Sequence, residues 1–392
     1  MLRTGGDGGR MRKSGAIFRQ EPHRVNGVLT LPYAMAKKPL ARKPLRKRKR
    51  GGDNPAPRAA RLEEVARMAG VSPITVSRAL RNPEIVAEET RGRIARAVKK
   101  IGYVRNFNAG ALASRKTTTI GFIVPTIMDV GFAEVIHAFY ETMGERNYQL
   151  LLGVSDYTEE EEERLVRDFL AHRAAGLILT GVSHGPEVYR MLKGMAVPTI
   201  EFWGLTQTPI DLCVGYSNAD AAYAMTRHLV RLGYKKIAFV SPLIGTVMRD
   251  NDRTRDRREG HRRALRDSGL GIDEALFTSG RLDFQSGANA LVELMGKRPD
   301  IEAIFFGNDV MAAGALMECQ KRGWAVPDKV AIAGFGDSEL ATVVQPALTT
   351  VRTPRHAMGK RAAELLLERI GGNTKVPKVV DMGFDVIQRD ST

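Results

Sequence analysis

Apolar runs alternate with amphipathic segments over residues 117–392 of the chain. The short runs have the length and composition of buried strands, and the segments between them repeat apolar residues at helical spacing. The predicted strands are Thr119–Val124, Gln149–Val154, Gly176–Thr180, Thr199–Phe202, Lys236–Val240, Ala303–Phe306 and Val330–Gly334. The predicted helices are Phe132–Arg146, Glu159–Ala171, Pro186–Met195, Ala219–Leu232, Arg257–Ser268, Asp309–Lys321 and Ala357–Ile370. This α/β pattern predicts parallel sheets covered on both faces, and its length allows two lobes.

Residues 59–105 show a different pattern, which predicts a small all-helical domain. The predicted helices span Leu62–Ala69, Pro73–Arg81 and Ala87–Ile101. Gly70 opens a tight turn, Ser72 is a favourable N-cap, and Pro73 suits the first position of the second helix. Two short helices joined by a glycine turn and supported by a third are typical of a helix-turn-helix DNA-binding headpiece. The rival interpretation is an accessory helical domain with an exposed polar face.

Positive charge is concentrated in the first third of the chain. The sequence has 60 Lys and Arg against 44 Asp and Glu, a net charge of +16. Residues 1–60 contribute +13, residues 61–116 contribute +7 and residues 117–392 contribute −4. Residues 1–58 are rich in Gly, Pro and basic residues. This composition predicts a disordered tail. Three interpretations of this tail are open. It is a solvated segment, it is an over-extended gene start with Met35 as the true initiator, or it is an arm that binds DNA phosphates.

Composition excludes several classes of protein. No apolar stretch is long enough to cross a membrane, and the N-terminus lacks the apolar region of a secretory signal. Cys213 and Cys319 are too few for a disulfide framework, which fits a reducing, cytoplasmic setting. No histidine pair has zinc-binding spacing, so no metal or cofactor is expected.

The second helix of the headpiece is the predicted recognition helix, and its partner is double-stranded DNA. In this motif the N-terminal residues of that helix reach base edges in the major groove. Here they are Pro73, Ile74 and Thr75, with Ser77 and Arg78 one turn later. Pro73 and Ile74 can read base shape or a thymine methyl group, while Arg78 can pair with guanine.

Residues 106–116 follow the headpiece and are predicted to act as a hinge and linker. The segment is short and weakly amphipathic, so as an isolated helix it would be marginal. Leu112 has no local core to join. The segment is either a plain linker or a helix that folds on DNA and inserts Leu112 between minor-groove base steps.

Three ordered motifs resemble the lactose-repressor/galactose-repressor family of bacterial transcription regulators. They are LEEVARMAGVSPITVSRALRN (Leu62–Asn82), NFNAGALAS (106–114) and IGFIVP (120–125), and the similarity spans residues 61–390. The resemblance implies a homodimer whose chains each carry two periplasmic-binding-protein-like (type I) lobes for effector binding and dimerisation. Residues 117–216 with about 352–372 would form the N-terminal lobe, and residues 217–349 with about 376–390 the C-terminal lobe.

The resemblance also assigns DNA-contacting positions, with Leu112 as the minor-groove lever. The implied DNA-binding residues are Leu62, Ser72, Pro73, Ile74, Thr75, Ser77, Arg78, Arg81, Thr90, Asn106 and Leu112. Within the family, segments such as Glu161–Thr180 and Leu348–Gly359 resemble gluconate-operon repressors. The implied function is repression of sugar-acid utilisation genes, relieved by a small sugar acid or sugar phosphate, with another sugar as the alternative effector.

Four residues are implied to bind the effector between the lobes: Glu201, Arg257, Asn308 and Asp337. Arginine suits a carboxylate or phosphate because its fork can donate two parallel hydrogen bonds. The rival interpretation of the Arg253–Arg258 region is a solvated helix start, and that of Glu201 is a surface acid. Asp309 is expected to cap the helix that follows Asn308.

Two departures from the family pattern point away from a neutral sugar. Gly336 stands where many sugar-binding members have an aspartate, and Trp203 stands where others have a strand-end aspartate. Both changes leave room for an anionic effector.

Two other functions fit the α/β pattern less well. A secreted sugar-binding protein would have a signal peptide and no headpiece, whereas this chain shows the opposite. A Rossmann-like enzyme would have a glycine-rich phosphate loop after its first strand, but this chain has Pro125-Thr126-Ile127 there. The sequence also contains no nucleophile–base constellation, so the chain is predicted not to be an enzyme.

Overall fold

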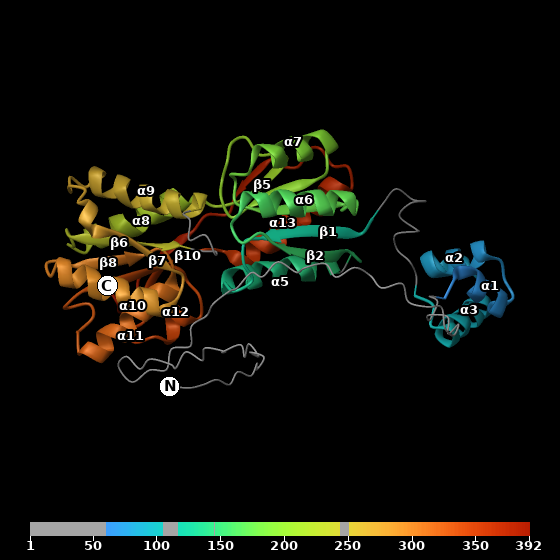
Figure 1. Cartoon of the computed structure of the whole chain (residues 1–392), viewed down its shortest axis with the longest axis horizontal. Coiled ribbons are helices and arrows are strands. Elements are labelled where there is room, and N and C mark those ends of the chain that lie inside the picture. Colours follow the sequence, from blue (N-terminus) through green and yellow to red (C-terminus); the bar gives the residue numbers. More distant parts are fainter. Residues whose placement is uncertain (1–59, 105–116, 145, 244–250) are drawn as a thin grey trace, which may run out of the picture. The chain divides into compact units, whose positions relative to one another are not determined.

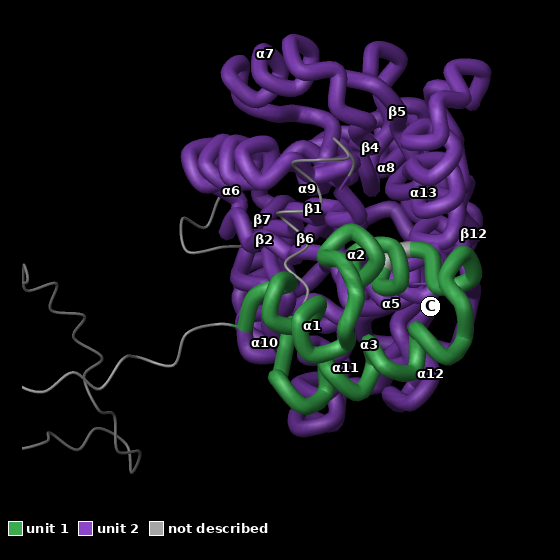
Figure 2. The backbone as a smooth tube through the Cα atoms, turned by 90° about the vertical axis from the view of Figure 1, so that its right-hand side faces the viewer, with its two compact units in different colours: residues 1–104 green, residues 105–392 purple. Residues whose placement is uncertain are grey.

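The structure is a computed structural model that describes residues 60–104, 117–144, 146–243 and 251–392. The chain forms two compact units, residues 1–104 and residues 105–392, drawn in different colours in Figure 2. The expected basic tail (1–58) and hinge (106–116) lie outside the described residues. In the described part of the chain, no helix is both long enough and apolar enough to cross a membrane.

The first unit has the expected helix-turn-helix arrangement. It consists of α1 (Leu62–Ala69), α2 (Pro73–Arg81), the short 3₁₀ turn η1 (Pro83–Ile85) and α3 (Glu88–Ile101). The Ser72 hydroxyl caps α2 by accepting a hydrogen bond from the Thr75 N–H at 3.1 Å. Val65, Val76 and Ile94, one from each α-helix, meet in a small buried core. The second helix is therefore capped and supported as predicted.

The second unit begins with a six-stranded, all-parallel sheet of order β11-β5-β4-β3-β1-β2. The strands are β1 (Thr119–Val124), β2 (Gln149–Val154), β3 (Gly176–Thr180), β4 (Thr199–Phe202), β5 (Leu212–Gly215) and β11 (Val379–Asp381). Helices α5 (Val130–Gly144) and α13 (Arg355–Ile370) pack on one face, and α6 (Glu159–Ala171) and α7 (Pro186–Met195) on the other (Figure 1). We call this the N-terminal lobe.

Strand β1 shows why these strands read as continuous apolar runs. Ile120, Phe122 and Val124 join the core beneath α5 and α13, whereas Ile123 joins the core beneath α6 and α7. Successive side chains point to opposite faces of a strand, so a sheet covered on both faces has no polar side.

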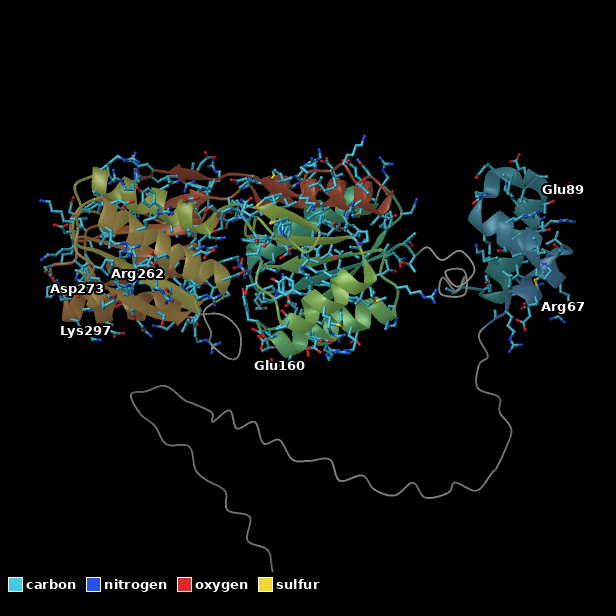
Figure 3. The ribbon with its side chains drawn as sticks, turned by 90° about the horizontal axis from the view of Figure 1, so that it is seen from above. Arg67, Glu89, Glu160, Arg262, Asp273 and Lys297 are labelled. Atoms are coloured by element: carbon cyan, nitrogen blue, oxygen red, sulfur yellow. The ribbon has the colours of Figure 1, made fainter. Side chains whose placement is uncertain are left out.

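The C-terminal lobe repeats this plan with the order β12-β10-β9-β8-β6-β7. Its strands are β6 (Ile237–Leu243), β7 (Phe277–Arg281), β8 (Ala303–Phe306), β9 (Ala331–Gly336), β10 (Thr349–Arg352) and β12 (Asp385–Ile387). Its main helices are α8 (Asn218–Arg231), α9 (Asp252–Asp267), α10 (Phe284–Lys297) and α11 (Asp309–Arg322), with the short elements η2 (Glu274–Leu276) and α12 (Leu340–Val343). Only β12 runs antiparallel to its neighbour in this sheet. Figure 3 labels three charged residues of this lobe, namely the half-buried Arg262 and Asp273 and the exposed Lys297.

The last strands correct the expected lobe boundary. Residues 376–390 were expected in the C-terminal lobe, but β11 pairs with β5 in the N-terminal sheet, and only β12 joins the C-terminal sheet. Val379 and Val380 extend an edge that β5 would otherwise leave unpaired, which is the physical reason for the difference. The chain therefore passes between the lobes three times, after β5, after β10 and after β11.

Helix α9 also differs from the prediction, and the difference affects the site. It begins at Asp252, five residues before the predicted start at Arg257, because the Asn251 side chain caps it by accepting a hydrogen bond from Thr254 N–H at 3.0 Å. The first turn is almost entirely charged, so the sequence showed no apolar repeat there.

The sequence analysis also missed five strands and one helix. These are β5, β7, β10, β11 and β12, and α10.

Candidate effector site and DNA-binding surface

The candidate site is a cavity between the two lobes, at the carboxyl ends of the parallel strands. Ligands in open α/β sheets bind at these ends, where loops from several strands converge. The cavity is lined by Asp129, Gly131, Phe132, Tyr157, Trp203, Tyr216, Pro242, Asn251, Arg253, Thr254, Arg257, Asn308, Phe335, Gly336, Thr353 and Arg355. Both lobes contribute, so a ligand bound here would contact each of them.

Arg257, on the second turn of α9, lies at the centre of the lining. Its Nε donates to Asn218 Oδ1 at 2.9 Å and its Nη1 to the Gly307 carbonyl at 2.8 Å. The guanidinium carbon lies 3.7 Å from the centre of the Phe335 ring. Burial lowers the pKa of Arg257, because its charge is removed from water. The side chain is thus rigidly held, buried and positively charged, as an anion-binding group requires.

Arg253 lies one turn before Arg257 and is also buried. Its Nη1 contacts Asp252 Oδ1 at 3.2 Å. Burial is the largest effect on the pKa of Arg253 and lowers it, but the charge of Asp252 together with Tyr157 and Tyr216 outweighs burial and raises the pKa. The rival interpretation of this region as a solvated helix start is therefore wrong for Arg253 and Arg257, because the capped first turn of α9 faces the cavity.

Arg355, at the start of α13, supplies a third arginine to the cavity. It donates from Nε to Glu134 at 2.6 Å and from Nη1 to the carbonyl of Gly336. Gly336 has a φ of 133°, and a side chain there would meet Asp309 at 3.3 Å and Arg355 at 3.5 Å. A φ of this value strains any residue that carries a side chain, so glycine suits this edge of the cavity.

Aromatic rings form the apolar part of the wall. Trp203 packs on Phe132 with ring centres 4.7 Å apart. Tyr216 and Phe335 are stacked, with ring centres 6.3 Å apart. Trp203 has a φ of 81° and is buried, and its ring adds apolar surface to the wall. These rings exclude water and strengthen the electrostatic interactions of the arginines.

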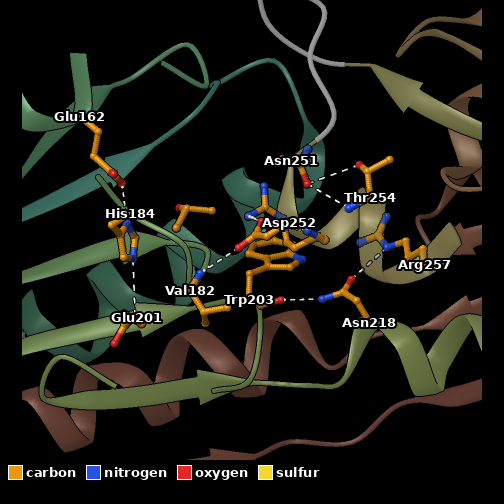
Figure 4. Close-up of polar contacts among 12 residues, drawn as sticks. Glu162, Val182, His184, Glu201, Trp203, Asn218, Asn251, Asp252, Thr254 and Arg257 are labelled. Atoms are coloured by element: carbon orange, nitrogen blue, oxygen red, sulfur yellow. Dashed lines mark hydrogen bonds and ion pairs between the residues drawn. The ribbon is translucent and has the colours of Figure 1, made fainter. Parts of the chain in front are cut away.

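Hydrogen bonds across the cavity connect the two lobes. Asn218 Nδ2, on α8, donates to the Trp203 carbonyl at 3.0 Å, and the Val182 N–H donates to Asp252 Oδ2 at 2.9 Å (Figure 4). Both Asp252 and Asn218 are bonded to an arginine that lines the cavity. A ligand that moves either arginine would therefore affect a contact between the lobes.

Glu201 was expected in this site, but it lies elsewhere. It faces His184 inside the N-terminal lobe and accepts a hydrogen bond from the Ile210 N–H. Figure 4 shows His184 between Glu162 and Glu201; the nitrogen–oxygen distances are 2.9 Å from Nδ1 to Glu162 and 3.6 Å from Nε2 to Glu201. Glu201 is 1% exposed, so it is not a surface acid either.

The charges of this buried cluster shift the pKa values of its members. Burial opposes the charged form of His184, but the hydrogen bond and charge of Glu162, with the charge of Glu201, outweigh burial and raise the pKa of His184. Burial raises the pKa of Glu201. Both shifts favour the protonated forms of His184 and Glu201.

Asp337 is also placed outside the cavity lining. Its carboxylate accepts hydrogen bonds from Arg352 Nε and from Arg389 Nη2, each at 2.6 Å. These ion pairs tie β10 to the C-terminal segment, and they occupy both carboxylate oxygens of Asp337.

Asn308 does line the cavity, but its capping role was misassigned. Its Oδ1 accepts from the Val310 N–H at 2.8 Å and caps α11, the role expected of Asp309. Asp309 is instead buried and accepts a hydrogen bond from the Thr350 hydroxyl at 2.6 Å.

The candidate DNA-binding surface is the exposed start of α2 in the first unit. Ser72, Pro73, Ile74 and Arg78 are exposed, and Ile74 keeps 64% of its surface accessible although it is apolar. The remaining expected residues Thr75, Ser77 and Thr90 are half-buried, and Leu62 packs against the headpiece core. The side chain of Arg81, and all of Asn106 and Leu112, lie outside the part of the chain that the structure describes.

A helix-turn-helix unit on the same chain as a two-lobed binding domain defines a DNA-binding transcriptional regulator. Residues 61–106 match the family model described as bacterial regulatory proteins, lacI family, and residues 226–392 match the periplasmic binding protein-like domain. The HTH-type transcriptional regulator GntR of Pseudomonas aeruginosa is 36% identical over 84% of this chain and 95% of its own. The GntR of Escherichia coli K12 is 34% identical over 82% of this chain and 96% of its own.

The solved structure of the transcription regulator GntR from Chromobacterium violaceum superposes with a TM-score of 0.66 at 34% identity, covering 70% of this chain and 98% of that one. The chain belongs to the lacI family of bacterial regulatory proteins. Its relatives are transcriptional regulators rather than enzymes.

Sequence reasoning missed several residues that line the cavity. Phe335 lies near the end of β9 and Arg355 follows β10, but only the pairing of those strands shows that both ends meet at the cavity. Asn251 could have been recognised as an N-cap, because asparagine is a favoured N-cap residue and stands directly before the charged run of α9.

Proposed function

We propose that this protein is a homodimeric repressor that binds a pseudo-palindromic operator and is released from it by a sugar acid, with gluconate as the leading candidate. The observation that carries the effector class is the cavity between the lobes, in which Arg257 is buried and held by uncharged partners among the described residues. Such an arginine is suited to an anionic ligand. The likeness to regulators named GntR supports the same choice.

The DNA-binding role is assigned to the start of α2 and to the hinge. Pro73, Ile74 and Arg78 would read base edges, and the exposure of all three side chains supports this assignment. The hydroxyls of Ser72, Thr75, Ser77 and Thr90, together with Leu62, Arg81 and Asn106, would contact the backbone and fix the register. Leu112 would act as the minor-groove wedge.

The homodimer is supported by an apolar surface on the N-terminal lobe. Met128, Val130 and Tyr140 are exposed on or beside α5, and Leu151 and Leu152 are exposed on the edge strand β2. Large apolar side chains left exposed on one helix and one edge strand suit a surface that a second copy of the chain would cover. Two headpieces related by a two-fold axis would then face two half-sites of the operator.

The mechanism follows from the hydrogen bonds between the lobes. The effector would bind the closed and open arrangements of the lobes with different affinities, and only that difference can shift the equilibrium. Because Asn218 and Asp252 link the cavity arginines to the other lobe, ligand binding would alter their contacts with Trp203 and Val182. The hinge would then leave its DNA-bound state.

Titration calorimetry on the full chain with gluconate, its 6-phosphate and related sugar acids tests the effector class. We expect heat from at least one acid, and release of the protein from a fluorescent operator at the same concentration. Operator binding without effector should have a Kd of roughly 10⁻⁸ M or tighter. No heat from any of these acids would refute the proposed effector.

A further inference from the structure

Two arginines face the cavity from the same side of α9. Arg253 and Arg257 are four residues apart, so they are neighbours on one face of the helix. Their side chains are 6% and 9% exposed, and both line the cavity. Two guanidinium groups buried next to each other repel, and burying each of them is costly without a negative partner.

The described residues supply one carboxylate in direct contact with this pair. Asp252 lies 3.2 Å from Arg253, and its second oxygen is used by the Val182 N–H. Arg257 is bonded to the side chain of Asn218, to the Gly307 carbonyl and to the Tyr216 hydroxyl, none of which carries a charge. One positive charge of the pair is thus without a directly bonded counter-charge among the described residues.

A second hollow adjoins the cavity, and Arg253 lines both. Its lining is rich in hydroxyl and carboxylate groups, which suit the hydroxyl groups of a polyol. These groups come from Ser155, Thr158, Glu159, Glu160, Glu162, Thr180, Ser183 and Asp252. Tyr157 and Asn251 are shared by the two hollows. Arg253 therefore stands between a cationic, aromatic compartment and one lined by hydroxyl and acidic groups.

We propose that Arg253 is a second anion-binding residue of this site. Together with Arg257 it clamps the carboxylate of a polyhydroxy acid, while the hydroxyl chain of that acid extends into the second hollow. The clamp makes the site select acids over neutral polyols of the same size. This proposal rests on the proposed effector function and adds a residue, an orientation and a basis for selectivity to it.

The selectivity can be tested with a charged and a neutral ligand of the same chain length. We would titrate gluconate and sorbitol into the full-length protein and into the Arg253→Gln variant. Hydrogen bonds to a charged group predict a loss of about 10-fold to 100-fold in gluconate affinity in the variant, with sorbitol affinity little changed. Arg266→Gln is the matched control, because Arg266 lies on the same helix, is exposed and pairs with Glu259.

A second variant separates a binding role from a folding defect. Arg253→Lys keeps the charge but loses the planar fork, so it should bind gluconate with an affinity between those of the wild type and Arg253→Gln. An unfolding midpoint in urea close to that of the wild type shows that each variant is folded. Gluconate binding by Arg253→Gln equal to wild type would overturn this proposal and leave the proposed function standing. Absence of binding of any sugar acid to the wild type would overturn both.

Discussion

Gly260 permits the close packing of α8 and α9, and we expect Gly260→Ala to disrupt it. A Cβ atom at this position would lie 2.0 Å from the backbone oxygen of Ala219, on α8. An ordinary contact of this kind is at least 3.4 Å, so the two helices would have to move apart by more than 1 Å. The obstacle is backbone, which cannot rotate away as a flexible side chain could.

The cost follows from what this interface buries. Ala222 and Met225 of α8 and Ala264 and Leu265 of α9 are all at most 3% exposed, so separating the helices opens a packed core. Overpacking of a core costs about 1–3 kcal/mol, and we expect the upper end, about 3 kcal/mol, because backbone must shift. For a unit of this size the melting temperature should fall by about 5 °C.

The same displacement should weaken effector binding, because Arg257 lies one turn before Gly260 on α9. The assays are urea denaturation and gluconate calorimetry on the full chain. Glu259→Ala is the control, since Glu259 is the exposed neighbour on the same helix. If Gly260→Ala unfolds within about 0.5 kcal/mol of wild type and binds effector normally, the packing argument is wrong.

Three further predictions concern the cap of α2, the buried cluster and the tail. Ser72→Ala should destabilise α2 by about 1 kcal/mol, seen as faster hydrogen exchange of Thr75 and its neighbours, whereas Ser72→Asn should preserve the cap. Because the pKa values of His184 and Glu201 are raised in the fold, the native state retains protons that the unfolded chain releases. The free energy of unfolding should therefore decrease as pH rises above the ordinary values of 4.5 for Glu and 6.5 for His, and Glu201→Gln should flatten that decrease. Removing residues 1–58 should reduce the salt dependence of operator binding by about 0.9 in log–log slope for each DNA phosphate that the tail neutralises, without changing sequence preference.

Each of these predictions has an opposing result. Equal exchange in the Ser72→Ala and Ser72→Asn variants would show that the cap contributes nothing measurable. A denaturation profile for Glu201→Gln that parallels wild type from pH 5 to 8 would remove the buried cluster as the cause. Identical salt slopes with and without residues 1–58 would show that the tail does not bind DNA.

Local sequence signals determined the headpiece almost completely. Its helices are defined by short-range features, namely an i, i+3, i+4 apolar repeat, the Ser72 cap and the Pro73 start, and these features act within a few residues. Strands such as β1 and β8 were equally clear, because a strand covered on both faces must be apolar throughout, whereas the inner strands β5 and β10 were missed. Short edge strands such as β11 and β12 lack that constraint, so their sequences did not reveal them.

The sequence by itself therefore determined the classes of the elements, the two-part organisation and the family. It also indicated Arg257 and Asn308 as residues of the effector site, because both lie in motifs that resemble those of the family. Only the tertiary structure decided which polar residues face the cavity. Glu201 and Asp337 were turned away into ion pairs, whereas Arg253 and Arg355 were brought in, because strand order and helix caps fix side-chain direction over distances that no local pattern spans.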